Sequence, residues 1–245
     1  MKNHLKATIS LLLVVFMNCN NDDDNSEPTI TQRDALILIY EANADNTLNW
    51  DISTNDISTW ENVGVDSNGN VTSLELIDKG LTTIPAEIGV FTNLTFLELR
   101  SNAITAIPNE IGNLTQLTYL GLNNNQIQSL PSTINQLSLL DRLFVYNNNL
   151  VNIPNEIGTM ITLERLELGA NDINIIPTVI GQLTNLEYLS FYHNAITSVP
   201  NELSSLTTLT TLDLSSNLLT TIPQVVCDLE LTGTTIIKDE TATCN

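Results

Sequence analysis

An interval of 23 residues runs through most of this sequence and constrains its fold more than any other feature. The apolar pattern that begins at Leu94 returns at Leu117 and continues at the same interval as far as Leu209. Towards the N-terminus the same register reaches Val71, so that residues 71–230 hold seven copies. A fixed period of this length indicates a solenoid, because each copy is one structural unit that buries its apolar side only against its neighbours.

The residues of one copy predict how the chain passes around the solenoid. In the second copy Leu97 and Leu99 stand two residues apart, which is typical of a short strand whose leucines point inward. Stacked copies would join these strands into a parallel sheet. Every copy then has a proline, whose fixed φ predicts a return wall of extended chain and short 3₁₀ turns. These prolines are Pro85, Pro108, Pro131, Pro154, Pro177, Pro200 and Pro223.

The copies share the pattern L-x-x-L-x-L-x-x-N-x-I-x-x-I-P-x-x-I-x-x-L, which resembles the leucine-rich repeat family in its 23-residue form. The resemblance implies an α/β solenoid: a curved rod with a parallel sheet on its concave wall, a short 3₁₀ or extended return wall, and a cap at each end. It also implies that a column of asparagine amides bonds the backbone of adjacent turns. This column is Asn102, Asn125, Asn148, Asn171, Asn194 and Asn217, with Lys79 in the first copy.

Residues 1–18 have the composition of an export signal. Two lysines precede the apolar run Ile9–Met17, which is too short to span a bilayer as a mature helix. Cys19 follows directly, which resembles a bacterial lipoprotein signal and implies that this cysteine carries lipid. Residues 16–18 depart from the usual lipoprotein pattern, so an ordinary secretory signal with an incidental cysteine is the alternative.

Residues 19–28 are polar and acidic and have too few apolar side chains to bury, so they are expected to form a disordered tether. An acidic run behind a lipidated cysteine resembles the surface-export signal of some Gram-negative lipoproteins. The alternative is a solvated spacer. The resemblance therefore implies a protein that is anchored by lipid to the bacterial outer membrane and exposed at the cell surface.

The chain has three cysteines. If Cys19 carries lipid, then Cys227 and Cys244 remain as one pair, and we expect a disulfide between them in an oxidising compartment. Two unpaired thiols are the alternative. A disulfide here would hold the tail over the open end of the core. Residues 231–245 leave the repeat register and are expected to form the C-terminal cap, with one last half-strand.

Residues 29–70 are expected to cap the first repeat. Thr31 and Asp34 have the spacing of a capping box, and apolar residues at helical intervals follow, which predicts a helix within residues 29–43. The segment resembles the N-terminal caps of bacterial and plant extracellular leucine-rich repeat proteins. Such a cap would shield the edge of the first strand.

A hairpin is predicted within residues 63–76, because Asn68 and Gly69 stand between two alternating runs. Trp50 and Trp60 are the only tryptophans, and we expect them in the core of this cap and not in contact with a ligand. The aspartate-rich turn does not complete an EF-hand, because its twelfth position, Ile77, is not glutamate. No metal motif and no cofactor motif is therefore predicted.

Charge excludes one class of partner. The chain has 8 basic and 28 acidic residues and a formal net charge of −20. A strongly acidic protein does not attract phosphate backbones, so we expect no nucleic acid partner. An anionic membrane surface would also repel it, which leaves lipid as the means of membrane attachment.

Three side chains of each copy are expected to point outward from the concave wall. These positions make up less than a tenth of the chain, yet they hold six of its twelve aromatic residues and three of its four arginines. Interfaces are enriched in these residue types, although exposed sheets also gain stability from aromatic stacking. The predicted ligand-binding residues are Phe96, Arg100, Tyr119, Asn123, Arg142, Phe144, Tyr146, Arg165, Tyr188 and Tyr192, with His193 beside them.

We expect that the protein is not an enzyme. Beyond the signal, His193 is the only histidine, so a Ser-His or Cys-His arrangement would have to use it. Glu75 and Glu98 are expected in neighbouring strands, where such a pair can serve acid–base chemistry. An open sheet, however, offers no closed pocket that would shift their pKa values.

The expected function is a lipid-anchored module of the cell surface that recognises a macromolecule, foremost a protein, through its concave face. A carbohydrate is the alternative partner, because aromatic rings stack on sugars and the amides of Asn123, Asn124 and Asn147 can bond hydroxyl groups. A structural spacer of the envelope without a specific ligand is the remaining interpretation.

Overall fold

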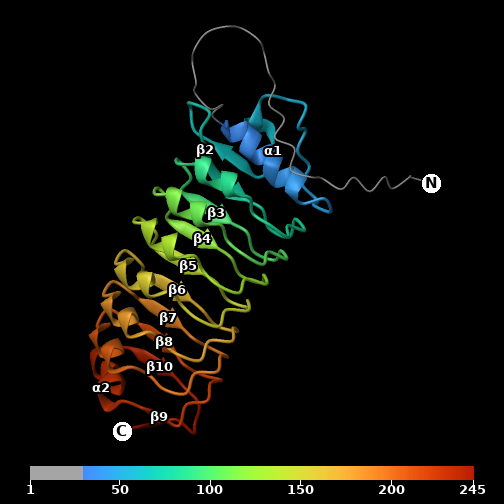
Figure 1. The fold of residues 1–245 in the computed structure, drawn as a ribbon. Coiled ribbons are helices and arrows are strands. Elements are labelled where there is room, and N and C mark those ends of the chain that lie inside the picture. The colour runs from blue at the N-terminus through green and yellow to red at the C-terminus, as the bar shows by residue number, and fades with distance from the viewer. Residues whose placement is uncertain (1–29) are drawn as a thin grey trace, which may run out of the picture.

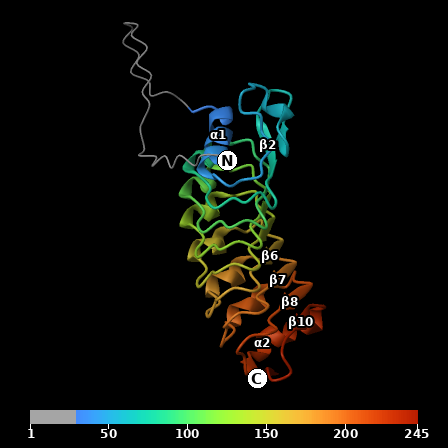
Figure 2. The ribbon, with the colours of Figure 1, turned by 90° about the vertical axis from the view of Figure 1, so that its right-hand side faces the viewer.

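The computed structural model describes residues 30–245, so that the predicted signal, Cys19 and the acidic tether lie outside the described range. The chain winds into a stack of turns, and Figure 1 shows that the turns follow one another in sequence order from the N-terminal to the C-terminal end. The side view in Figure 2 shows a curved rod with the strands on the inner side of the bend. The predicted curved solenoid is confirmed.

One sheet of nine strands runs along the rod. Its order is β1-β2-β3-β4-β5-β6-β7-β8-β10, and all neighbours are parallel except β1 and β2, which form an antiparallel hairpin. The strands are short because each turn of the solenoid gives only one segment to the wall. They are β1 (Val63–Val65), β2 (Val71–Glu75), β3 (Phe96–Glu98), β4 (Tyr119–Gly121), β5 (Arg142–Phe144), β6 (Arg165–Glu167), β7 (Tyr188–Ser190), β8 (Thr211–Asp213) and β10 (Thr235–Ile237).

The return wall consists of 3₁₀ helices, as the prolines predict. A proline stands at the N-cap of each repeat helix, and the helices lie side by side on the face of the rod away from the strands (Figure 2). They are η2 (Ala86–Val90), η3 (Asn109–Asn113), η4 (Ser132–Gln136), η5 (Asn155–Thr159), η6 (Thr178–Gln182) and η7 (Asn201–Ser205). The seventh repeat differs, because a short α-helix, α2 (Gln224–Cys227), follows its proline.

A continuous apolar core fills the rod between the two walls. The strand register pairs Leu97 with Leu120 and Leu120 with Leu143, so that equivalent leucines form rows along the rod. All three are fully buried. Each copy is therefore stabilised by its two neighbours, as expected for a solenoid.

The asparagine column bonds the backbone as predicted. Asn125 lies in the core, where its amide nitrogen donates to the carbonyls of Leu99 and Leu122, both at 3.0 Å. Its carbonyl oxygen accepts from the backbone N–H of Ile104 at 3.0 Å. Each later member bonds the equivalent three groups, two of which belong to the preceding repeat. The column therefore fastens consecutive turns to each other.

A second column, which the sequence analysis missed, stands one residue before the asparagines. Every repeat has one residue here with left-handed backbone, and φ lies between 51° and 59°. This conformation turns the chain out of the strand, and asparagine, aspartate and similar short polar residues adopt it more readily than others. The members are Asp78, Ser101, Asn124, Asn147, Ala170, His193 and Ser216.

A helix and a hairpin stand at the N-terminal end of the rod. Helix α1 (Gln32–Ala42) begins with the predicted capping box between Thr31 and Asp34, and it packs against η2. A short 3₁₀ helix, η1 (Ile57–Thr59), leads into β1. Trp50 and Trp60 are buried and stack on each other with ring centroids 5.3 Å apart. The two tryptophans are therefore core residues, as predicted.

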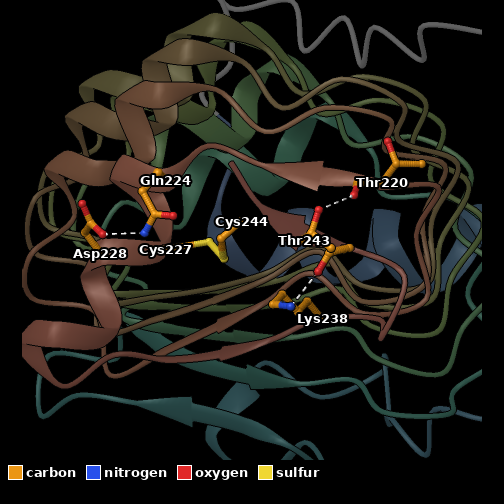
Figure 3. The surroundings of a disulfide bond; sticks show 8 residues. Thr220, Gln224, Cys227, Asp228, Lys238, Thr243 and Cys244 are labelled. Carbon is orange, nitrogen blue, oxygen red and sulfur yellow. Dashed lines mark hydrogen bonds between the residues drawn. A yellow bond between two sulfur atoms is a disulfide. The ribbon is translucent and has the colours of Figure 1, made fainter.

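The tail closes the C-terminal end. After the 3₁₀ helix η8 (Asp228–Thr232), β10 adds the last strand to the main sheet, which matches the predicted half-strand. The final strand, β11 (Thr243–Cys244), pairs with β9 (Thr221–Ile222). The predicted disulfide between Cys227 and Cys244 joins α2 to β11 with a Cα–Cα distance of 6.1 Å (Figure 3). It holds the tail across the end of the core.

Loss of this disulfide is expected to destabilise the C-terminal end. The bridge closes a loop with a sequence separation of 17 residues, for which the chain-entropy model gives about 3 kcal/mol. The double variant Cys227→Ser/Cys244→Ser should therefore unfold at lower denaturant concentration than the oxidised wild type. Reduced wild-type protein is the matched control and should behave like the variant. Equal midpoints for the oxidised protein and the variant would contradict this role.

Among the residues that the structure describes, none of the helices has the length and apolar character needed to cross a bilayer.

Candidate functional site

Five planar side chains from five successive repeats form one continuous line on the concave wall. The rings of Phe96 and Tyr119 stack at 4.4 Å between centroids and 16° between planes, and Tyr119 meets Phe144 at 5.1 Å and 40°. The guanidinium of Arg165 lies 5.7 Å from the Phe144 ring centroid and 4.0 Å from that of Tyr188. We call these five side chains the ring row. Aromatic stacking and cation–π attraction both favour such an arrangement.

The strand register produces most of the ring row. Phe96 faces Tyr119 across β3 and β4, and Arg165 faces Tyr188 across β6 and β7. The middle of the row involves two positions of β5. Arg142 stands in register with both Tyr119 and Arg165, and its guanidinium forms an ion pair with Asp141 at 3.4 Å.

Phe144, two residues further along β5, supplies the central ring. Arg142 therefore lies beside the ring row, and the Phe144 ring connects Tyr119 to the Arg165 guanidinium.

A second line of side chains lies where the strands end. Tyr146 and Tyr192 are exposed by 36% and 37%, and they lie on the two sides of Gly169 in the repeat between them. A Cβ atom on Gly169 would lie 3.1 Å from Cδ2 of Tyr146 and 3.1 Å from the carbonyl oxygen of Tyr192. The Tyr146 ring therefore leans over a position that has no side chain.

The remaining predicted residues lie beside these two lines. Arg100 is exposed, and Asn123 accepts a hydrogen bond from the backbone N–H of Tyr146 at 2.7 Å. His193 is exposed and belongs to the left-handed column, and its ring lies 5.7 Å from that of Tyr192. The left-handed turn accounts for the backbone conformation of His193, and the exposed ring points to solvent beside Tyr192.

The charges on the wall are held by specific partners. The Nε atom of Arg165 donates to Glu167 at 2.7 Å, which fixes the guanidinium between its two rings. Burial, the nearby carboxylate of Glu98 and a hydrogen bond to it raise the pKa of Tyr119. Burial and the charge of Glu167 raise the pKa of Tyr188. Both phenols are therefore neutral hydrogen-bonding groups across the physiological pH range.

The two glutamates that the sequence placed in neighbouring strands do face each other across β2 and β3. Their environments differ, however. Glu75 is exposed, whereas Glu98 is 5% exposed and accepts a hydrogen bond from the Tyr119 hydroxyl at 2.8 Å. Within residues 30–245 no group of three or more histidine, cysteine, aspartate or glutamate side chains is arranged to hold a metal ion.

Two sequence families match the chain over the repeats. The model described as "Leucine-rich repeat region" matches residues 71–177, and that described as "Leucine Rich repeats (2 copies)" matches residues 184–226. Together these ranges take in more than half of the chain. The protein belongs to the leucine-rich repeat family. A comparison of this leucine-rich repeat protein with curated proteins finds no match.

Solved structures similar to this leucine-rich repeat protein include two plant receptors. One is the ectodomain of the membrane receptor kinase GASSHO1/SCHENGEN3 from Arabidopsis thaliana in complex with CASPARIAN STRIP INTEGRITY FACTOR 2. It is 28% identical with a TM-score of 0.78, and the match covers 87% of this chain and 27% of that chain. The other is the plant peptide hormone receptor RGFR1 in complex with RGF2. It is 31% identical with a TM-score of 0.66, and the match covers 76% of this chain and 30% of that chain.

A bacterial structure shares the fold. An internalin, InlF from Listeria monocytogenes, is 23% identical with a TM-score of 0.62, and the match covers 74% of this chain and 53% of that chain. The leucine-rich repeat protein described here thus spans between about a quarter and a half of the length of these three structures.

Proposed function

We propose that this chain is a lipid-anchored module of the bacterial cell surface and that its concave wall binds a protein. The ring row is the observation that carries the proposal. It places aromatic and guanidinium groups, which dominate the energy of protein interfaces, in one line across five consecutive repeats. A partner that lies along the rod would contact all of them together.

The shape of the wall supports a macromolecular partner. The sheet is open and the row extends over β3 to β7, which suits a long surface or an extended segment better than a small molecule in a closed pocket. Two of the similar plant receptors were solved with their peptide or protein partners, and one is called a peptide hormone receptor. This chain is much shorter than those receptors, so a similar use of its wall is part of the proposal.

Several features favour binding over catalysis. Proteins of this family typically act as binding modules. The one buried carboxylate on the wall, that of Glu98, is already bonded to Tyr119 and to the backbone N–H of Arg100. The open sheet would leave a reacting group in water, where general acid–base catalysis gains little from a shifted pKa. We therefore propose that the chain is not an enzyme.

Carbohydrate is the second candidate, because exposed rings such as Tyr146 and Tyr192 can stack on sugars. The amides that would bond the hydroxyl groups are partly engaged within the chain. The amide of Asn147 donates to that of Asn124 at 2.9 Å, and Asn123 accepts from the backbone of Tyr146. Fewer free amide groups remain for a sugar than the sequence suggests, which favours a protein partner.

The binding test uses the segment 29–245 immobilised on beads and exposed to extracts of the bacterial surface and of neighbouring cells. The retained material is divided into protein and polysaccharide, and each is titrated against the segment. Saturable binding of a purified protein supports the proposal, and retention of polysaccharide alone supports the second candidate. If neither protein nor polysaccharide binds, the proposal fails, and the result supports a structural spacer without a specific ligand.

The anchor has its own test. If Cys19 carries lipid, the variant Cys19→Ser should lose all incorporation of a labelled fatty acid and should leave the membrane fraction. The cysteine pair at the C-terminus is a matched control, because Cys227→Ser/Cys244→Ser should keep the label. Surface exposure is read by protease treatment of intact cells. Labelling of the Cys19→Ser protein at the wild-type level would contradict the anchor.

A further inference from the structure

Glu98 is the charged side chain whose burial the binding surface alone does not explain. Among residues 30–245 it is the only charged residue in the buried class, and none of the ion pairs found there includes it. A carboxylate removed from water without a cation is costly unless hydrogen bonds compensate it. Its hydrogen-bond partners therefore indicate what it does.

Both oxygens of this carboxylate are bonded within the wall. Oε2 accepts from the Tyr119 hydroxyl at 2.8 Å, and Oε1 accepts from the backbone N–H of Arg100 at 3.1 Å. The position opposite Glu98 in β4 is Gly121. A Cβ atom there would lie 2.3 Å from Oε1, so the missing side chain of Gly121 provides the space that the carboxylate occupies.

Tyr119 is consequently held on three sides. Glu98 binds its hydroxyl, Phe96 covers one side of its ring at 4.4 Å, and Phe144 meets it at 5.1 Å. A ring fixed in this way has little freedom to leave the row. A partner then loses less entropy when it binds, because the side chain is already in place.

We propose that Glu98 is a positioning residue, which holds Tyr119 in the ring row and so preforms the N-terminal half of the binding surface. The inference rests on the proposed function of the ring row. It also bears on specificity. The hydroxyl proton of Tyr119 is committed to Glu98, so the phenol oxygen offers a partner only an acceptor. The nearby negative charge disfavours an acidic group of the partner at this place.

The experiment follows the ionisation of Tyr119 by ultraviolet absorbance in the intact 29–245 segment, without any partner. The variant Tyr119→Phe identifies which of the five tyrosines is observed. In Glu98→Ala the titration of Tyr119 should move to lower pH, because the acceptor and its charge are gone. Glu98→Gln keeps an acceptor oxygen without the charge. In this variant Tyr119 should therefore titrate at a pH between those of the wild type and Glu98→Ala.

A second variant acts on the same contact without touching either partner. Gly121→Ala places a methyl group where the carboxylate lies, so the Tyr119 titration should again move to lower pH. The matched control is Glu75→Ala, which removes an exposed carboxylate from the equivalent position of the preceding repeat and should leave the titration unchanged. Far-ultraviolet circular dichroism at each pH verifies that the chain is folded, and the titrations are compared only over the pH range in which all variants are folded.

The near-ultraviolet circular dichroism of the stacked rings is the second readout, and it should weaken in Glu98→Ala and Gly121→Ala. A Tyr119 titration that is the same in wild type, Glu98→Ala and Gly121→Ala would overturn the inference. Because no partner is present, this result is separate from the binding test. The titration can shift as expected even if the wall binds nothing, in which case the positioning stands and the proposed function fails.

Discussion

Replacement of Asn148 by alanine is expected to cost about 2–4 kcal/mol of unfolding free energy, because one buried backbone N–H would lose its only partner and two carbonyls would each lose one of two donors. The Asn148 amide nitrogen donates to the carbonyls of Leu122 and Val145, and its oxygen accepts from the N–H of Ile127. Asn148 is only 9% exposed, so water has little access to these groups. Equilibrium unfolding in urea measures the loss.

Asn149 provides the matched control. It is the same residue type, adjacent in sequence and exposed, so Asn149→Ala should change the free energy of unfolding by no more than about 0.5 kcal/mol. If the two alanine variants unfold at the same urea concentration, the asparagine column does not fasten the turns as described.

The variant Asn148→Asp adds a pH dependence to the same site. The carboxylate would keep the acceptor for Ile127 but would turn a donor into an acceptor against two carbonyls. Burial and these carbonyls would raise the folded-state pKa of the new aspartate above its unfolded value of about 3.9. The unfolded state then binds fewer protons, so the variant should lose stability relative to wild type as pH rises from 4 to 7. Equal losses at both pH values would contradict this reasoning.

The repeats made the architecture predictable from sequence. A strict interval of 23 residues fixes which leucines meet, and proline at one repeated position excludes long helices on the return wall. Trp50 and Trp60 could be assigned to the core because the segment before the repeats needs large apolar groups of its own to pack. In such a chain most local signals recur in six or seven copies, so that they support each other.

The contacts on the wall were less predictable, because they depend on choices between neighbours that have no period. The register alone placed Arg142 beside Tyr119, yet Asp141 attracts Arg142 and Phe144 takes the central place. The burial of Glu98 depends on a glycine one repeat later, which no pattern within a single copy reveals.

Removal of three rings from the wall is expected to weaken binding of the captured protein at least a hundredfold. The variant is Phe144→Ser/Tyr146→Ser/Tyr192→Ser. It removes the central ring of the ring row and the two exposed tyrosine rings beside the row. Buried aromatic residues at the centre of an interface often contribute about 2 kcal/mol or more each, so the loss of three exceeds the roughly 2.7 kcal/mol of a hundredfold change. Tyr119 is kept, because its removal would leave the buried carboxylate of Glu98 without its hydroxyl donor.

The control removes as many exposed apolar side chains from other walls. Leu139→Ser/Ile161→Ser/Ile175→Ser changes residues that are exposed by 46%, 57% and 64% and that lie outside the outward strand positions. Binding should change by less than about threefold, since rim and remote residues contribute little. Circular dichroism verifies that both variants are folded, and the wall variant should be somewhat less stable because the half-buried Phe144 ring contacts Tyr119 and Arg165. If the control weakens binding as much as the wall variant, contact is made by exposed apolar groups in general and the ring row is not the recognition surface.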